Sequence, residues 1–156
     1  MLLHGSCHCQ AVRFTVEAPH PYPYNLCYCT ICRKTAGAGG YAINIGAENA
    51  TLKIEGKDNI GSYQARLENG ELSPAERKFC NVCATALWVW DPRWPELLHP
   101  HASAIDTELP TPPEKTHLML SAKAPWVQPC VGARDKEFEQ YPDESIAAWH
   151  ERLGLG

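Results

Sequence analysis

Apolar and polar residues alternate along several short stretches of the chain, as they do in strands that bury one face. The clearest stretch runs from Gln10 to Glu17, where valine and phenylalanine alternate with arginine, threonine and glutamate. Shorter runs of the same kind, apolar or alternating, follow later in the chain. They predict strands at 41–45, 51–55, 61–67, 87–90, 103–107 and 116–123.

Turn-forming residues separate these stretches and limit the length of each element. The chain holds 13 prolines and 11 glycines, which predicts short strands and many turns rather than long helices. Asn69-Gly70 is typical of a hairpin turn. One short helix is predicted near the C-terminus, opening at 142–144, with Trp149 on its apolar face and Gly154 at its end. The whole pattern predicts a mainly β fold with a short C-terminal helix.

Length and charge narrow the possible functions. The chain has 156 residues, which suits a single domain spanning 1–156. Its net charge is −4, from 14 Lys+Arg against 18 Asp+Glu, so no basic surplus favours nucleic acid or an anionic membrane as a partner. No signal peptide and no run of about 18 apolar residues is visible, and we therefore expect a cytoplasmic protein. In a reducing compartment, clustered cysteines are metal-binding or catalytic more often than disulfide-bonded.

The candidate chemistry lies in the cysteines, of which the chain has eight. All but Cys130 fall into three groups with ligand-like spacing. The groups are Cys7 and Cys9, then Cys27, Cys29 and Cys32, then Cys80 and Cys83. A zinc ion that only supports structure takes four protein ligands, whereas a catalytic zinc keeps one position open. The way in which the cysteines divide among sites therefore decides between a structural and a catalytic role.

Two partitions of the cysteines are open. In the first, the 7/9 and 80/83 pairs form a closed four-thiolate site, and the 27–32 cluster holds a metal with one protein ligand missing. In the second, the 7/9 pair joins Cys27 and Cys29, while Cys32 joins the 80/83 pair and a histidine, so that both sites are closed. We prefer the first partition, because the C-x-C-x-x-C segment can wrap one ion without help.

We also make predictions for several other residues outside these groups. Arg33 and Lys34 would favour thiolate over thiol and attract anionic ligands, or they are ordinary surface charges. Thr30 would cap a short helical turn that carries Cys32. Cys130 is expected to be a small buried residue of the core. The histidines of 99–101 are expected at the surface or a strand end rather than on a metal.

Four segments of the chain resemble the glutathione-dependent formaldehyde-activating enzyme family. They are GSCHC at 5–9, LCYCTICRK at 26–34, FCNVC at 79–83 and KAPWV at 123–127. The resemblance covers essentially the whole chain, and it implies a zinc-bearing β-tent fold of coiled antiparallel sheets. It also implies a structural zinc on the four-cysteine set and a catalytic zinc on the 27–32 cluster. The activity it implies is that of a carbon–sulfur lyase, joining glutathione and formaldehyde to give S-hydroxymethylglutathione.

Two positions depart from the family pattern. The family usually has glycine after the first C-x-C and after the C-x-x-C, where this chain has Gln10 and Ala84. Glycine at such a position often serves a positive φ. We therefore expect the local backbone to differ at Ala84, with the metal retained.

Three functions are consistent with these observations. The first is a zinc-dependent carbon–sulfur lyase acting on an aldehyde adduct of glutathione or another small thiol. Its zinc would be held by the 27–32 cluster, Arg33 and Lys34 would bind ligand carboxylates, and Trp126 is expected in the core rather than in the pocket. The second is a non-catalytic zinc module for a protein or thiol ligand, which a closed 27–32 site would favour. The third, a methionine sulfoxide reductase, needs a free nucleophilic cysteine, and only Cys130 is left for that role.

Overall fold

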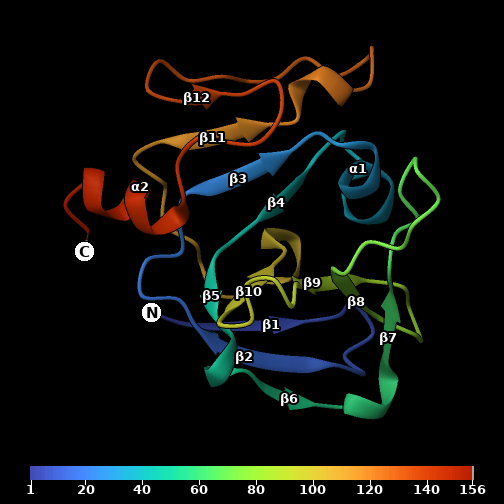
Figure 1. Ribbon diagram of the computed structural model, residues 1–156. Helices are drawn as coiled ribbons and strands as arrows, with labels where there is room; N and C mark the ends of the chain where they lie inside the picture. Colours follow the sequence, from blue (N-terminus) through green and yellow to red (C-terminus); the bar gives the residue numbers. More distant parts are fainter. Residues whose placement is uncertain (156) are drawn as a thin grey trace.

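The computed structural model describes residues 1–155, and within them twelve short strands form three sheets (Figure 1). Gly156, the last residue of the predicted domain, lies outside the described residues. The strand orders are β1-β2-β6 in the three-stranded sheet, β5-β10-β9-β8-β7 in the five-stranded sheet and β12-β11-β3-β4 in the four-stranded sheet. The mainly β fold predicted from the sequence is confirmed.

The elements are short, as the number of prolines and glycines predicts. The three-stranded sheet is built from β1 (Leu2–Ser6), β2 (Arg13–Glu17) and β6 (Lys53–Glu55). The five-stranded sheet is built from β5 (Ala47–Glu48), β7 (Ile60–Tyr63), β8 (Glu76–Cys80), β9 (Ala86–Trp90) and β10 (Leu97–Pro100). The four-stranded sheet is built from β3 (Tyr24–Cys27), β4 (Ala42–Asn44), β11 (Lys115–Leu118) and β12 (Lys136–Glu137). The two α-helices are α1 (Thr30–Ala36) and α2 (Ile146–Arg152).

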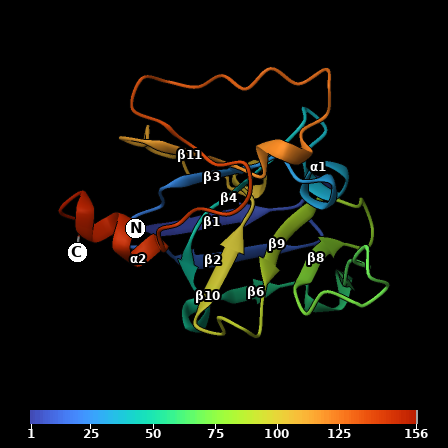
Figure 2. The same ribbon diagram turned by 45° about the horizontal axis from the view of Figure 1, so that its top comes forward.

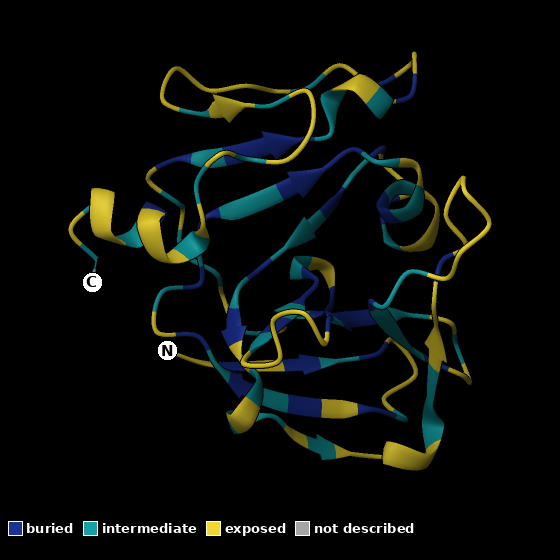
Figure 3. Ribbon diagram, viewed as in Figure 1, coloured by how far each residue is buried: buried dark blue, intermediate teal, exposed yellow. Residues whose placement is uncertain are grey.

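The sheets lie at two levels (Figures 1 and 2). The four-stranded sheet forms one level, with α1 and α2 near its opposite ends, and the other two sheets form the second level. Buried residues gather on the strands in the interior, whereas the long outer loops are exposed (Figure 3). The Phe14 ring meets the Trp88 ring edge to face, with centroids 5.0 Å apart, and this contact joins the three-stranded sheet to the five-stranded sheet.

The four-stranded sheet differs from the other two sheets because it contains parallel as well as antiparallel pairs of strands. β3 pairs with β4 antiparallel but with β11 parallel, and β11 pairs with β12 parallel. The antiparallel arrangement expected from the resemblance therefore holds for the other two sheets and for β3 with β4. An isolated bridge between Asn44 and His101 connects β4 to the end of β10. This bridge brings the four-stranded sheet next to the five-stranded sheet beside α1.

Several predicted strands are confirmed and others are corrected. The alternation at 10–17 gives β2, in which Phe14 and Val16 are buried and Arg13 is exposed. The Asn69-Gly70 turn is present, and Gly70 has a φ of 85°. The strand predicted at 103–107 is wrong, because the chain forms a 3₁₀ turn at Ala102–Ala104 and then a single bridge. The strand predicted at 116–123 ends at Leu118, since a 3₁₀ turn at Leu120–Ala122 follows it.

The predicted C-terminal helix is confirmed, with a corrected start. α2 begins at Ile146 rather than at 142–144, because the side chain of Ser145 accepts a hydrogen bond from the Ala148 N–H at 3.1 Å and caps the helix. Trp149 is buried as predicted, and Gly154 follows the helix with a φ of 69°. Within residues 1–155, no helix is both long and apolar enough for a membrane span.

Two single residues expected in the core are exposed instead. Trp126 is 62% exposed, and Cys130 is also exposed. Both lie in the connection between β11 and β12, which runs along the outer face of the four-stranded sheet. Ala124 and Val127 of the same connection are buried in a cluster with Leu26 of β3, so the burial of an apolar residue here depends on its position in the loop and not on its type alone.

Candidate metal centre

Four thiols from two sheets meet at the first candidate site. Cys7 and Cys9 directly follow β1, Cys80 ends β8, and Cys83 lies in the turn between β8 and β9. The four sulfur atoms lie within 4.8 Å of one another. The Cys7 and Cys9 Sγ atoms are 3.6 Å apart, and those of Cys9 and Cys80 are 3.8 Å apart. Tetrahedral zinc with Zn–S bonds of about 2.3 Å separates its sulfur ligands by about 3.8 Å, so these residues fit a closed zinc site.

The backbone around this site supports thiolates. The Val12 N–H donates to Cys7 Sγ at 3.2 Å, and the Val82 N–H donates to Cys80 Sγ at 3.4 Å. Gln10 and Ala84, the two departures from glycine, have φ values of 66° and 65°. The expectation of an altered backbone is therefore wrong. Both turns keep the left-handed conformation that glycine favours, and the larger residues are held in it.

Three thiols form the second candidate site, at the level of the four-stranded sheet. Cys27 ends β3, Cys29 precedes α1, and Cys32 lies in its first turn, with all three sulfur atoms within 4.8 Å of one another. Cys29 is the N-cap of α1, because its Sγ accepts a hydrogen bond from the Cys32 N–H at 3.2 Å. The prediction that Thr30 caps this turn is wrong, since Thr30 is already the first helical residue. Cys27 and Cys32 are buried and Cys29 is half-buried.

The cysteines group as in the first of the two partitions. No histidine, carboxylate or further cysteine among residues 1–155 joins the three-thiol cluster within the same 4.8 Å range. The second partition would need Cys27 near Cys7 and Cys32 near Cys80, and the described structure keeps these pairs in separate clusters. The closed shell that would favour a non-catalytic module is thus not formed by the described residues, nor is Cys130 part of it.

Arg77, which the sequence gave no reason to single out, lies directly beside the three-thiol cluster. Its Nη1 and Nη2 atoms are 3.7 and 3.8 Å from Cys32 Sγ. Asn44 approaches the same sulfur from β4, with its Nδ2 atom at 3.8 Å. Hydrogen bonds from Cys27 and Cys29 and the nearby Arg77 guanidinium lower the pKa of the Cys32 thiol. The cluster therefore keeps negative charge at Cys32.

The cations predicted to serve this site lie elsewhere on α1. Arg33 and Lys34 are in the last turn of the helix, where positive charge is favourable, and Lys34 is exposed. Within residues 1–155, neither residue forms a hydrogen bond or ion pair with the three thiols. Their predicted role in binding ligand carboxylates stays a prediction. Sequence proximity suggested these two cations, whereas β8 brings Arg77 from 45 positions away.

A cavity of about 250 Å³ opens next to Arg77, between α1 and strands β7 to β9. Thr35, Phe79, Ala86 and His101 are among the residues that line it. His101 is 2% exposed, and burial lowers its pKa to about 4, so that its ring is neutral near pH 7. His101 Nδ1 and Asn44 Oδ1 are buried polar atoms without a hydrogen-bond partner among the described residues. Arg77 thus lies between the cavity and Cys32, and one lining residue, His101, has an unsatisfied polar atom.

A buried polar network supports the loop that carries Cys27 and Cys29. Tyr28, between them, contacts His117 Nδ1 through its hydroxyl at 2.9 Å, and His117 Nε2 lies 3.1 Å from Asp135 Oδ2. Burial acts to raise the pKa of Asp135, but hydrogen bonds from the Lys115 and Gly132 N–H groups and from His117 outweigh it and lower the pKa to about 2. This network fixes β3, β11 and the loop after β11 to one another.

The C-terminal segment also passes close to the three-thiol cluster. Met119 packs against the cluster, and its N–H donates to the Gln140 carbonyl at 2.8 Å. Tyr141 follows, and partial burial together with the charges of Cys27, Cys29 and Cys32 raises the pKa of its phenol. Met119 has a φ of 59°, a rare conformation for a residue with a side chain.

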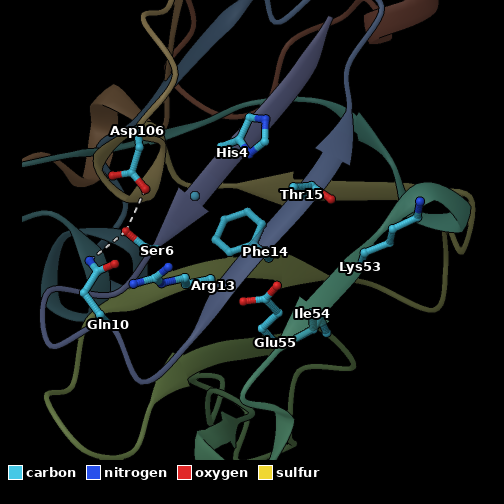
Figure 4. A pocket seen from close by; sticks show the side chains of 11 residues that line it. His4, Ser6, Gln10, Arg13, Phe14, Thr15, Lys53, Ile54, Glu55 and Asp106 are labelled. Atoms are coloured by element: carbon cyan, nitrogen blue, oxygen red, sulfur yellow. Dashed lines mark hydrogen bonds between the residues drawn. The ribbon is translucent and has the colours of Figure 1, made fainter.

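A larger cavity of about 510 Å³ lies on the three-stranded sheet, away from the three-thiol cluster (Figure 4). Its floor is Phe14, and its rim carries charged residues of both signs, including Arg13 and Glu55. Ser6 Oγ donates to Asp106 Oδ2 at 2.6 Å and accepts from Gln10 Nε2 at 3.1 Å. No thiol of the described residues lines either cavity, but Arg77 lines the smaller one and contacts Cys32 Sγ, so we place the candidate chemistry beside the smaller cavity.

Comparisons with known proteins agree with this geometry. The family model described as glutathione-dependent formaldehyde-activating enzyme matches residues 2–121. A protein of Halomonas elongata, whose name assigns it provisionally as a glutathione-dependent formaldehyde-activating enzyme, is 61% identical over 155 residues, covering 99% of this chain and 98% of its own. A crystal structure of a Rhodobacter sphaeroides protein is similar with a TM-score of 0.52 and 25% identity, covering 70% of this chain and 92% of that one.

Proposed function

Because the chain belongs to the glutathione-dependent formaldehyde-activating enzyme family, we propose that it acts as a carbon–sulfur lyase on the adduct of a small thiol and an aldehyde. Glutathione and formaldehyde are the proposed pair, and S-hydroxymethylglutathione is their adduct. In the direction of synthesis, the thiol gives up its S–H proton and its sulfur bonds to the carbonyl carbon. The carbon–oxygen π bond becomes an oxygen lone pair, and that oxygen takes up a proton, so that no proton is gained or lost overall. Lyase action is the reverse.

The observation that carries this proposal is the incomplete three-thiol cluster. Cys27, Cys29 and Cys32 gather within 4.8 Å without a fourth ligand among residues 1–155, while the four other clustered cysteines form a complete set. These three residues would hold a zinc ion, which when bound supplies a Lewis-acid position that the protein leaves open. The four-cysteine set would hold a structural zinc. A closed site alone offers no place for a substrate.

Residues of the chain itself prepare the surroundings of the cluster. The Tyr28–His117–Asp135 network and the Cys29 cap hold the three thiols together before any ligand arrives. Cys27 and Cys32 are buried, which limits the access of water to these two sulfur atoms. The nearby cavity leaves room for a small molecule beside Arg77, which contacts Cys32. The arrangement suits a small thiol and a small carbonyl compound better than a macromolecule.

The test is a matched pair of cysteine variants in the zinc-loaded protein. Cys29→Ser should lower the zinc content by about one ion per chain and remove the acceleration of adduct formation, while the fold is kept because the four-cysteine set is intact. Cys130→Ser is the control, and since Cys130 is exposed and outside both clusters, it should leave both readings unchanged. Zinc is measured by elemental analysis, and the rate is measured by NMR of ¹³C-formaldehyde with glutathione.

Two results would contradict the proposal. If the protein with two zinc ions per chain accelerated no reaction between a small thiol and a small aldehyde, the lyase assignment would fail. If Cys130→Ser abolished activity instead, the reactive group would be the lone exposed thiol. The third function considered from the sequence, reduction of methionine sulfoxide, would then regain support.

A further inference from the structure

The surroundings of Arg77 differ from those of Lys78, the next residue on β8. Successive residues of a strand point to opposite faces. On β8, Lys78 pairs with Glu76 at 3.3 Å and donates to Ser62 at 3.1 Å. Arg77 faces the other way, and within residues 1–155 it has no carboxylate partner. Its acceptors are Cys32 Sγ and, at 3.4 Å, Thr35 Oγ1.

A half-buried arginine without a carboxylate needs another source of negative charge. The sulfur of Cys32 provides it in its thiolate form, the form that ligates a metal, and both terminal nitrogens of the guanidinium lie within 3.8 Å of that sulfur. Asn44 Nδ2 adds a third donor from β4. Among the described residues, no side-chain donor from another strand is directed in this way at Cys27 or Cys29. Cys32 is therefore the thiol at which the protein concentrates positive potential.

The charge of the incomplete site indicates which kind of ligand, anionic or neutral, this positive potential favours. Three thiolates exceed the charge of a divalent zinc by one negative charge, and a fourth thiolate would double the excess. A neutral ligand would add none. With Cys27 and Cys32 buried, water screens this repulsion poorly, and a fixed guanidinium beside the sulfur offsets it. Arg77 would matter little for a neutral ligand and much for an anionic one.

The position of the cavity adds a second observation. Arg77 also lines the cavity of about 250 Å³ that has His101 in its wall. The Nδ1 atom of His101 is a buried polar atom without a partner among the described residues. Arg77 thus both contacts Cys32 Sγ and lines this cavity. A ligand in the cavity would therefore lie beside Arg77, with Thr35 and His101 offering further polar contacts.

We propose that Arg77 is a positioning residue that makes the three-thiol site selective for a thiolate over a neutral ligand, with the rest of that ligand lying in the cavity that Arg77 lines. This inference rests on the proposed function, because it specifies the ionic form in which the thiol substrate binds. It assigns the selectivity to a residue on β8, outside the cysteine motifs.

The test is ligand binding to the cobalt-substituted protein, without any turnover. A new sulfur-to-cobalt absorption band reports a thiol at the three-thiol site, because the closed four-thiol site has no free position. Glutathione is the anionic probe and imidazole the neutral one. Arg77→Met should weaken glutathione binding about ten- to hundredfold, the loss expected for one charge-assisted hydrogen bond, and leave imidazole binding within about twofold. Arg77→Lys should restore most of the glutathione affinity.

Arg66→Met is the matched control, because it removes the same charge from an exposed arginine whose only acceptor among residues 1–155 is the Gly70 carbonyl. It should bind both probes like the wild-type protein. Equal weakening of both probes in Arg77→Met, unchanged glutathione binding, or loss of cobalt from the cluster would each overturn the selective role. The proposed function would survive these results. If the wild-type protein bound no thiol at all, both the inference and the proposed function would fail.

Discussion

At the scale of single residues, each of the two turns beside the four-thiol site has a residue other than glycine in the left-handed backbone conformation that glycine favours. Gln10 and Ala84 both have a positive φ. An L-residue in this region costs roughly 1–2 kcal/mol relative to glycine, partly offset because glycine loses more backbone entropy on folding. Each residue closes the turn that holds its cysteine pair, because the Gln10 N–H donates to the Cys7 carbonyl at 3.1 Å and the Ala84 N–H donates to the Cys80 carbonyl at 2.8 Å.

Ala84→Gly should therefore stabilise the zinc-loaded protein by about 0.5 to 1 kcal/mol, because it relieves the strain without removing a hydrogen bond. The measurement is the free energy of unfolding in urea, with zinc present throughout. Gln10→Gly is the informative comparison. It relieves the same strain but loses the bonds from Gln10 Nε2 to Ser6 Oγ and the Cys7 carbonyl, so its net effect should be near zero. Destabilisation by Ala84→Gly would contradict this explanation.

At the scale of elements, α2 is held to the four-stranded sheet by a few specific contacts. Trp149 is buried and donates from Nε1 to Glu114 Oε1 at 3.0 Å. Arg152 donates to the same carboxylate at 2.7 Å, and His150 Nε2 meets the Tyr22 carbonyl at 2.6 Å. The helix has seven residues, too few to be stable alone, so these contacts decide whether it forms.

Glu114→Gln should destabilise the protein at neutral pH by about 1 to 2 kcal/mol, a range that allows for the partial exposure of Arg152. Hydrogen bonds from Arg152 lower the pKa of Glu114 below its usual 4.5. A lowered pKa gives stability that is complete above the unfolded-state pKa and is lost as the pH falls through the folded-state pKa. The difference between wild type and variant should therefore be constant from pH 6 to 8, in round figures, and shrink below about pH 4.5.

Glu144→Gln provides the control for this measurement, because Glu144 pairs with the same arginine from a more exposed position. Its effect should be below about 0.5 kcal/mol. Unfolding free energies of the three proteins across the pH range test the pair directly. A Glu114→Gln penalty that stayed constant down to pH 3 would show that charge is not its cause.

At the scale of the whole molecule, the four-thiol set connects two sheets across the chain. Cys9 and Cys80 are 71 positions apart, and they join the end of β1 to the end of β8. The Phe14–Trp88 contact lies between the same two sheets. A metal at this site would close a long loop, and its binding energy would count toward folding. The three-thiol cluster, by contrast, spans only six positions and closes no long loop.

The two clusters should therefore respond differently to the loss of one ligand. Cys80→Ser should remove one zinc and lower the unfolding free energy by roughly 3 to 5 kcal/mol, a part of the about 10–16 kcal/mol that structural zinc contributes in small domains. Cys32→Ser should also remove one zinc but cost less than about 2 kcal/mol, because the fold does not depend on it. Elemental analysis combined with chemical denaturation separates the two cases. Equal costs would show that both clusters are structural.

Much of this organisation could be predicted from the chain itself. The alternation around Phe14 predicted β2, and the apolar face that includes Trp149 predicted the C-terminal helix. The spacing of the cysteines gave three groups and favoured the partition that the structure forms. These features depend on neighbours within a few positions, and local periodicity and ligand spacing encode them. The predictions for Trp126 and Cys130 failed because burial depends on what the rest of the fold places over a residue.

The tertiary structure alone decided what surrounds the incomplete cluster. Arg77 is 45 positions from Cys32, and Asn44 reaches the same sulfur from a different sheet. Sequence order pointed to Arg33 and Lys34, because they are adjacent to the motif. The direction of a side chain on a helix or strand is set by the backbone, and the residues that it meets are set by how the sheets pack. The motif therefore determined where the chain gathers three thiols, and the packing of β8 against α1 determined which charged side chain lies beside them.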